Sequence, residues 1–317
     1  MRIIFMGTPY FARTCLEGLV GASFARPHMQ VIAAITQPDR PGGRGKRLQS
    51  PPVKEYALKM GIPVLQPEKI KSADSIAALQ QLNADIFVVA AYGQILPQKI
   101  LDMPKFGAIN VHASLLPKYR GASPIQQAIA DGETATGITI MQMDKGMDTG
   151  GMLLKREIAI DAHDTGGTLH DKLCALAPQA LLDALELIES GKAYPEAQDN
   201  ALATYAPLIT KQMAKINWCK SPIEIVNLVR AYNPFPGAFT KIGGGQVKIW
   251  MAKIADMGPS FGRPAGEIIL ACPKDGIIVA AAGGAVRITE LTPPNSKKMS
   301  AADFVRGHKI EAGEILT

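Results

Sequence analysis

Two polar residues, Asn110 and His112, stand in an apolar run that predicts a β-strand over 108–112. Because side chains alternate along a strand, both point to one face, roughly 7 Å apart, while Ile109 and Val111 point to the other. At the carboxyl end of a strand in an open α/β sheet, such a pair faces the ligand crevice. A lone histidine in a strand is more often a hydrogen-bonded core residue. The Asn-x-His pair, which runs into a proline-containing loop, favours a functional site.

A carboxylate that could complete this site, Asp148, lies in the turn-rich loop 144–151 after another predicted strand, 137–143. Aspartates followed by glycine or threonine usually shape turns. If the two strands are neighbours, however, we expect both strand ends to place Asp148 beside His112. The carboxylate would then orient the imidazole and support its protonated form, an arrangement common in acid–base chemistry.

The elements that must position these residues follow the alternation of apolar strands and helical patterns that is typical of βαβ units. The first 190 residues therefore predict an α/β domain with a doubly wound, mostly parallel sheet. Its predicted strands are 3–6, 31–36, 63–65, 86–91, 108–112, 137–143 and 152–160.

Helix start signals stand at Thr8-Pro9 and at Ser123-Pro124, where the hydroxyl is predicted to cap the helix and the proline to occupy its first position. The longest helical pattern spans 167–190. Residues 191–209 hold two prolines and lack a sustained period, so we predict a linker there.

Beyond this linker, residues 210–317 predict a second, smaller domain. A helix over 223–232 precedes five short strand-like runs separated by glycine-rich turns, and a last helix is predicted over 299–306. Five strands in about 55 residues favour a small β-barrel of the partly open OB type. The strand-like runs are 238–242, 247–254, 266–270, 276–280 and 285–291.

Positive charge is concentrated in the carboxyl-terminal part of the chain. The first 204 residues hold 20 basic and 20 acidic residues, whereas the remaining residues hold 14 basic and 8 acidic. The net charge of +6 therefore belongs to the second domain, which favours a polyanionic partner. A solvated basic surface that only keeps a protein soluble is about as common.

Several other classes of protein are disfavoured by the motifs. The first predicted strand is followed by Gly-Thr-Pro rather than G-x-G-x-x-G, and the glycine-rich run 42–47 lacks the Ser or Thr of a Walker A motif. The four cysteines are scattered, without the spacing of a zinc site or a disulfide framework. Apolar runs are too short for a secretory signal or a membrane span. We therefore expect a cytoplasmic protein, a monomer, with no metal and no membrane partner.

The motifs together resemble the folate-dependent formyltransferases, whose shared triad is Asn, His and Asp. The similarity is carried by Asn110-x-His112, by Ser114-Leu-Leu-Pro117 with Arg120-Gly121, and by the 143–150 loop. Three further segments, 5–9, 36–46 and 230–236, resemble the methionyl-tRNA formyltransferases over essentially the whole chain. Met147 stands where that family commonly has leucine, and Gly151 where it often has aspartate.

This resemblance implies transfer of a formyl group from 10-formyltetrahydrofolate to the α-amino group of methionyl initiator tRNA, which gives N-formylmethionyl-tRNA for translation initiation. Such a reaction passes through a tetrahedral intermediate that carries an oxyanion. The family implies that Asn110 and protonated His112 donate to that oxyanion. Asp148 would hold His112 and help to remove the amine proton through water. This chemistry requires neither a metal nor a covalent intermediate.

Binding residues are also implied by the resemblance. The reduced folate is expected against Ser114, Leu115, Leu116 and Pro117, and near Ile95 and Leu96. The basic loop 37–52, which alone would suggest a solvated surface, is expected to enter the acceptor stem of the tRNA. Its candidate contacts are Arg40, Arg44, Lys46 and Arg47, with Arg44 the best single candidate.

Two alternatives remain open at this point. A formyltransferase with the same donor could act on a small-molecule amine, but the basic loop and basic second domain argue against it. A non-catalytic RNA-binding protein could share the fold, but the intact triad argues against that.

Overall fold

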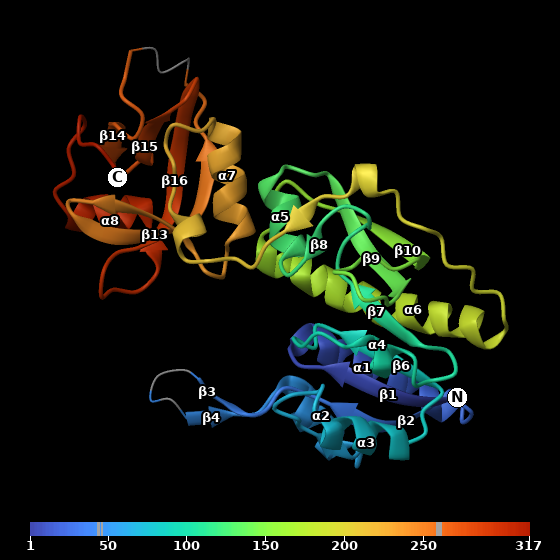
Figure 1. Cartoon of the computed structure of the whole chain (residues 1–317). Helices are drawn as coiled ribbons and strands as arrows, with labels where there is room; N and C mark the ends of the chain where they lie inside the picture. The colour runs from blue at the N-terminus through green and yellow to red at the C-terminus, as the bar shows by residue number, and fades with distance from the viewer. Residues whose placement is uncertain (43–44, 46, 258–261) are drawn as a thin grey trace. The chain divides into compact units, whose positions relative to one another are not determined.

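The computed structural model of the protein describes residues 1–42, 45, 47–257 and 262–317, and these form two compact units (Figure 1). The first unit comprises 1–121, 136–158 and 170–205. The second comprises 122–135, 159–169 and 206–317. The chain therefore crosses between the units several times, and the predicted domain division at 191–209 stays a prediction.

The first unit is built on a seven-stranded sheet with the order β10-β9-β7-β6-β1-β2-β5 (Figure 1). The pairs from β7 to β5 are parallel, whereas β9 pairs with β7 in the antiparallel direction. Every strand predicted for this domain is present, which confirms the mostly parallel α/β sheet. The strands are β1 Arg2–Gly7, β2 Gln30–Ile35, β5 Val64–Leu65, β6 Ile86–Ala90, β7 Ala108–His112, β9 Ala135–Gln142 and β10 Met152–Ala159.

The central strands are apolar because both of their faces are covered. All five residues of β6 are buried, as are the last five of β1. Such continuous apolar runs are typical of parallel strands with helices on both sides of the sheet. The helices along this part of the chain are α1 Tyr10–Ala25, α2 Pro52–Lys59, α3 Ala73–Gln81, α4 Gln98–Leu101, α5 Pro124–Ala130 and α6 Gly166–Glu189.

Neither predicted hydroxyl cap forms, although Ser123 and Pro124 begin α5 at the predicted positions. The hydroxyl of Thr8 donates to the carbonyl of Tyr92 at 2.9 Å instead of capping α1, and Pro9 occupies the N-cap position. Ser123 occupies the N-cap position of α5 but forms no side-chain capping bond. The Thr8 signal failed because the loop after β6 provides a competing acceptor that is distant in sequence.

The predicted loop 37–52 contains a short antiparallel hairpin formed by β3 (Arg40–Gly42) and β4 (Arg47–Gln49). Asp39 anchors its base, since the carboxylate accepts from Lys54 at 2.8 and 2.9 Å and from Gln66 at 2.9 Å. The ammonium of Lys54, with Gln66, holds the pKa of Asp39 below its usual value. The described part of this loop is therefore tied to the domain at its base.

The second unit contains helix α7 (Pro222–Ala231) and an antiparallel sheet with the order β12-β13-β16-β15-β14, with β17 paired to β16. All five predicted strand-like runs are strands of one antiparallel sheet, which confirms a small antiparallel β domain, whereas the OB type of the predicted barrel stays a prediction. The bounds are β12 Ala238–Ile242, β13 Gly245–Ile254, β14 Ile268–Cys272, β15 Gly276–Ala281, β16 Gly284–Thr292 and β17 Met299–Ser300, with α8 at Ala301–Gly307.

The carboxyl-terminal segment joins the two edges of this sheet. At β14, the N–H of Ile268 donates to the carbonyl of Glu314, and the N–H of Leu316 donates to the carbonyl of Gly266. At β12, Thr317 and Lys241 each donate a backbone N–H to the carbonyl of the other. A strand edge leaves backbone groups unpaired, and this segment pairs some of these groups at each of the two edges. None of the helices in the described part of the chain has the length and apolar character of a membrane span.

Helix α7 begins with a reciprocal cap. Glu224 accepts from the backbone N–H of Ser221 at 3.0 Å and from its hydroxyl at 2.6 Å, and Lys220 approaches it at 3.0 Å. These donors, the Ser221 hydroxyl first, lower the pKa of Glu224 from 4.5 to about 2. Since Ile225 and Val229 of this helix belong to the core of the second unit, the cap stabilises an element of that core.

The cap predicts a pH-dependent stability. Because the pKa of Glu224 is lower in the folded state, its stabilisation is complete above pH 4.5 and disappears as the pH falls towards 2. We expect Glu224→Ala to lower the thermal midpoint more at pH 6 than at pH 3, measured by circular dichroism. Glu224→Gln, which keeps an acceptor without the charge, should show a smaller and flatter effect. A difference between Glu224→Ala and wild type that is constant from pH 6 to pH 3 contradicts this account.

Candidate active site

The strands that carry the predicted site residues, β7 and β9, are neighbours. His112 lies opposite Thr139 and Asn110 opposite Met141 in an antiparallel register. Because the strands run in opposite directions, the carboxyl end of β9 lies at the amino end of β7. The expected reason for the approach of Asp148, shared strand ends, is therefore wrong. The loop after β9 instead folds back over β7 before β10 begins.

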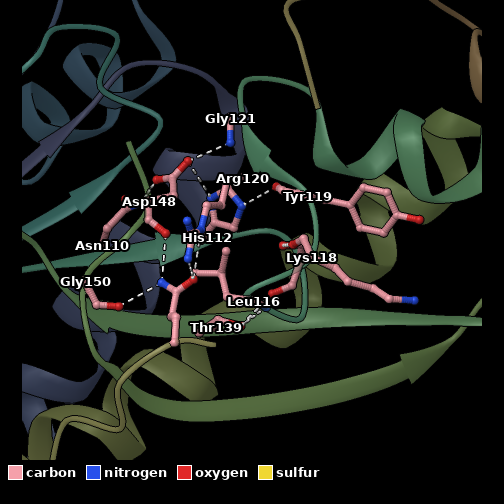
Figure 2. A network of polar contacts seen from close by, with 12 residues as sticks. Asn110, His112, Leu116, Lys118, Tyr119, Arg120, Gly121, Thr139, Asp148 and Gly150 are labelled. Carbon is pink, nitrogen blue, oxygen red and sulfur yellow. Dashed lines mark hydrogen bonds and ion pairs between the residues drawn. The ribbon is translucent and has the colours of Figure 1, made fainter. Parts of the chain in front are cut away.

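This fold-back brings the three predicted polar residues together (Figure 2). One carboxylate oxygen of Asp148, Oδ1, lies 3.5 Å from Asn110 Nδ2, and the other, Oδ2, lies 3.8 Å from His112 Nδ1. The backbone N–H of Gly121 donates to Oδ2 at 2.8 Å. The expected proximity of Asp148 to His112 is thus present, and the Gly121 N–H holds the same oxygen, Oδ2, that faces His112.

The imidazole of His112 is buried, with 6% of its surface exposed. Its Nε2 lies 2.9 Å from the carbonyl oxygen of Tyr119. A carbonyl oxygen can only accept, so Nε2 must carry a proton in both the neutral and the charged ring. Neutral His112 therefore has its lone pair on Nδ1, the atom that faces Asp148. A proton gained or lost by this ring must be exchanged at Nδ1.

The loop after β7 is held by buried polar bonds. Ser114 donates from its hydroxyl to the carbonyl of Lys118 at 2.7 Å. Thr139 on β9 donates to the carbonyl of Ser114 at 2.6 Å and accepts from the N–H of Leu116 at 3.1 Å. Leu116 packs in an apolar cluster with Met141 and Met152. Ser114 and Leu116 thus shape the loop from within, whereas Leu115 and Pro117 are only half-buried.

Arg120 joins this loop to the segment after α6. Its guanidinium is 2% exposed and donates from Nε and Nη2 to Gln198 Oε1, at 3.0 and 2.8 Å, and from Nη2 to Asn200 Oδ1 at 2.9 Å. Gln198 Nε2 in turn donates to the carbonyls of Asp148 and Gly150, both at 2.8 Å. Sequence reasoning missed Gln198 and Asn200, since no period or motif distinguishes them from an ordinary polar linker.

Two glycines allow the chain to pack this closely. A Cβ at Gly150 would lie 1.7 Å from the carbonyl oxygen of Gln142, so only glycine fits there. A Cβ at Gly151 would lie 2.6 Å from Cβ of Pro195. Gly151, the departure from the formyltransferase pattern, therefore lets the segment after α6 lie directly against the site loop.

The loops that follow four parallel strands meet at one edge of the sheet. The carbonyl of Tyr92, after β6, accepts from Thr8, after β1, and from Gln37, after β2. Residue Val89 of β6 pairs with Asn110 of β7, so the loops after β6 and β7 leave the sheet side by side. Ligands of open α/β sheets bind at such an edge. The site residues of β7 therefore lie where a ligand is expected.

The residues predicted near the folate differ in exposure within this edge. Ile95 is 86% exposed, whereas Leu96 is 4% exposed and packs in the apolar cluster around Phe87 and Ile100. Only Ile95 presents its side chain to solvent, and Leu96 can offer little but its backbone. The contacts of both residues with a folate stay predictions.

Two of the four residues predicted to contact nucleic acid, Arg40 and Arg47, lie in the β3–β4 hairpin. Arg40 forms an exposed ion pair with Glu68 at 2.9 Å, and Arg47 is exposed on β4. The other two, Arg44 and Lys46, lie outside the described residues. An exposed ion pair contributes about 0–1 kcal/mol, so Arg40 can exchange Glu68 for another anion at little cost.

Comparison with known proteins identifies the family. The formyl transferase model matches residues 1–185, and the model of the formyl transferase C-terminal domain matches residues 208–309. The methionyl-tRNA formyltransferase of Nitrosomonas eutropha is 47% identical over 99% of this chain and 97% of its own length. The methionyl-tRNA formyltransferase of Ruminiclostridium cellulolyticum is 47% identical over 100% of this chain and 99% of its own length. The chain belongs to the methionyl-tRNA formyltransferase family.

Solved structures share the fold of this family member at lower identity. WlaRD, a sugar 3N-formyl transferase, superimposes with a TM-score of 0.65 at 20% identity, covering 94% of this chain and 99% of that one. HypX from Aquifex aeolicus, solved with tetrahydrofolic acid, superimposes with a TM-score of 0.61 at 17% identity. This match covers 99% of this chain and 50% of the HypX chain. At these identities the comparison establishes the fold alone.

The contact between His112 and Tyr119 predicts a tautomer. We expect the neutral ring to carry its proton on Nε2, because the Tyr119 carbonyl cannot donate. Long-range ¹⁵N–¹H correlation spectra of protein labelled at histidine would distinguish the two ring nitrogens, with His112→Gln assigning the signal. A neutral His112 protonated on Nδ1 contradicts the arrangement.

Proposed function

We propose that this formyltransferase moves the formyl group of 10-formyltetrahydrofolate to the α-amino group of methionyl initiator tRNA, with Asn110, His112 and Asp148 as its catalytic residues. Membership of the family, with relatives 47% identical over the full chain, supports the reaction. The observation that carries the residue assignment is the placement of the Asp148 carboxylate between the Asn110 amide and His112 Nδ1.

The residues of the crevice suit the formyl donor. The loops after β6 and β7 leave the sheet side by side, and half-buried Leu115 and Pro117 offer apolar surface for a flat ring. Backbone groups of the same loops can pair with the edge of the ring. The donor supplies the formyl carbon, and the polar face of β7 receives the charge that develops when the amine attacks it.

The donors of this face are already oriented. The Asn110 amide has two N–H groups, and when one points to Asp148 the other is free to donate to the formyl oxygen. A protonated His112 presents Nδ1–H to the same oxygen, because Nε2–H remains bonded to Tyr119. Fixed donors aimed at a developing oxyanion need no reorganisation during the reaction.

Protons can be handled by the carboxylate. The amine must lose a proton after attack, and Asp148 can accept it through a water while its second oxygen stays bonded to Gly121. The departing N10 of the folate must gain a proton, and Nδ1 of His112 is the ring atom available to donate it. Charge therefore moves within one compact group of side chains.

The acceptor is proposed on separate grounds. The two relatives named above are methionyl-tRNA formyltransferases, and the second part of this chain holds the whole net positive charge. Basic side chains bind the phosphates of nucleic acid without reading its sequence. The proposed cytoplasmic location follows from the same substrate.

The reaction is tested by incubating purified protein with methionyl initiator tRNA and 10-formyltetrahydrofolate and measuring N-formylmethionyl-tRNA. Parallel reactions contain elongator methionyl-tRNA or a nucleotide-linked amino sugar. Product only with the initiator supports the proposal. Product only with the sugar would assign a small-molecule acceptor, and tRNA binding without any product would assign a non-catalytic RNA-binding protein.

We expect His112→Ala and Asp148→Asn each to lower kcat by about 10²- to 10⁴-fold, the range for loss of a general acid–base group or oxyanion donor. Binding of tRNA should not change, since neither residue belongs to the basic surfaces. Asp144→Asn is the matched control, because Asp144 lies in the same loop and its carboxylate accepts from Gly146 and Thr149 of that loop. Near-normal turnover in either site variant removes that residue from the mechanism.

The hairpin predicts a change in salt dependence. If Arg47 contacts a phosphate, Arg47→Ala should make the slope of log affinity for tRNA against log salt shallower by about 0.7–0.9. Lys155→Ala is the control, since Lys155 is exposed on β10 at the opposite edge of the sheet. Arg44→Ala should chiefly weaken discrimination between initiator and elongator tRNA. Equal slopes in wild type and Arg47→Ala count against a phosphate contact.

A further inference from the structure

The segment that follows α6 contributes polar side chains to the site, although it lies outside both matched family domains. The match to the first family domain ends at residue 185, and the match to the second begins at residue 208. Between them, residues 195–206, here called the strap, are fixed at both ends. Met152 and Glu196 exchange two backbone bonds, and β11 (Tyr205–Ala206) pairs with β8 (Arg120–Gly121). The strap is therefore an ordered part of the structure rather than a free connection.

Three polar side chains of the strap each form a hydrogen bond with a catalytic residue or with the loop that holds one in place. Gln198 donates to the backbone carbonyl of Asp148. Asn200 accepts from Arg120, which precedes the Gly121 N–H that holds the Asp148 carboxylate. The hydroxyl of Thr204 accepts from the N–H of Tyr119 at 2.9 Å, and the Tyr119 carbonyl holds His112.

Gln198 occupies the centre of this arrangement. Its amide nitrogen uses both N–H groups, one for the carbonyl of Asp148 and one for that of Gly150, while its oxygen accepts twice from Arg120. Asp148 has φ 54°, in the left-handed region that few side chains adopt without support. Gln198 binds the carbonyls of both Asp148 and Gly150, so it holds the turn in that conformation.

We propose that Gln198 is a positioning residue for formyl transfer. Its amide N–H groups hold the 148–150 turn so that the Asp148 carboxylate stays between Asn110 and His112. This inference rests on the proposed function for its kinetic part. A displacement of about 1 Å in such a group can lower a rate about 100-fold. We therefore expect the loss of these Gln198 bonds to lower kcat rather than to weaken substrate binding.

The two halves of the Gln198 amide can be tested separately. Gln198→Glu keeps the acceptor for Arg120 but replaces the two donors with an oxygen that repels the carbonyls of Asp148 and Gly150. Gln198→Met has similar length and removes both halves. Gln179→Glu is the matched control, because Gln179 lies exposed on α6 and its amide donates to Asp183 of the same helix.

We expect Gln198→Glu to lower kcat by about 10- to 100-fold, with KM for both substrates within about 2-fold and a thermal midpoint near that of wild type. The pH profile of kcat should also change, since the placement of Asp148 does. Gln198→Met should lose both kcat and thermal stability, because it leaves buried Arg120 short of acceptors. If activity follows the thermal midpoint instead, so that Gln198→Glu retains wild-type kcat, Gln198 only satisfies Arg120 and the proposal is overturned.

A measurement that needs no activity separates this proposal from the proposed function. Lys145 is exposed in the same loop, so trypsin should cleave after it faster in Gln198→Glu than in wild type or Gln179→Glu. Gln198→Asn, whose amide is one methylene too short to span both carbonyls, gives the same test if Gln198→Glu does not fold. Unchanged cleavage in both variants overturns the proposal. Absence of formylated product with wild-type protein would instead overturn the function.

Discussion

The structure depends on one constraint, that the loop after β9 must fold back across β7. Because β7 and β9 are antiparallel, an aspartate beyond the end of β9 would otherwise lie away from His112. The return is possible because Gly150 can lie against the carbonyl of Gln142 and because Asp148 adopts a positive φ. The Gly121 N–H and the amide of Gln198 then fix both the carboxylate and the backbone of Asp148. The loop that carries Asp148 is therefore held by bonds from two other parts of the chain.

Most of the fold could be predicted because its signals are local. The apolar runs of β1 and β6 and the alternation of β7 each determine an element without reference to distant residues. Asn110 and His112 were placed on one face by strand periodicity alone. The Thr8 cap failed for the opposite reason, since the Tyr92 carbonyl that accepts its hydroxyl bond is distant in sequence.

The candidate site could be predicted only as far as its motifs reach. The proximity of Asp148 to His112 was expected, but for a reason that the antiparallel pairing of β7 and β9 excludes. Gln198 and Asn200 carry no sequence signal, because their importance arises from bonds to buried Arg120 that exist only in the folded chain. The tautomer of His112 likewise follows from a backbone carbonyl, which every residue has.

The coupling between His112 and Asp148 is measured most directly by a double-mutant cycle on kcat for formylation of methionyl initiator tRNA. If the carboxylate acts in part through Nδ1 of His112, the double variant His112→Ala/Asp148→Asn should lose clearly less rate than the product of the two single losses, since coupled residues are not additive. Effects that multiply, so that the double variant loses the product of the two single losses, would show that the residues act independently and would contradict this account.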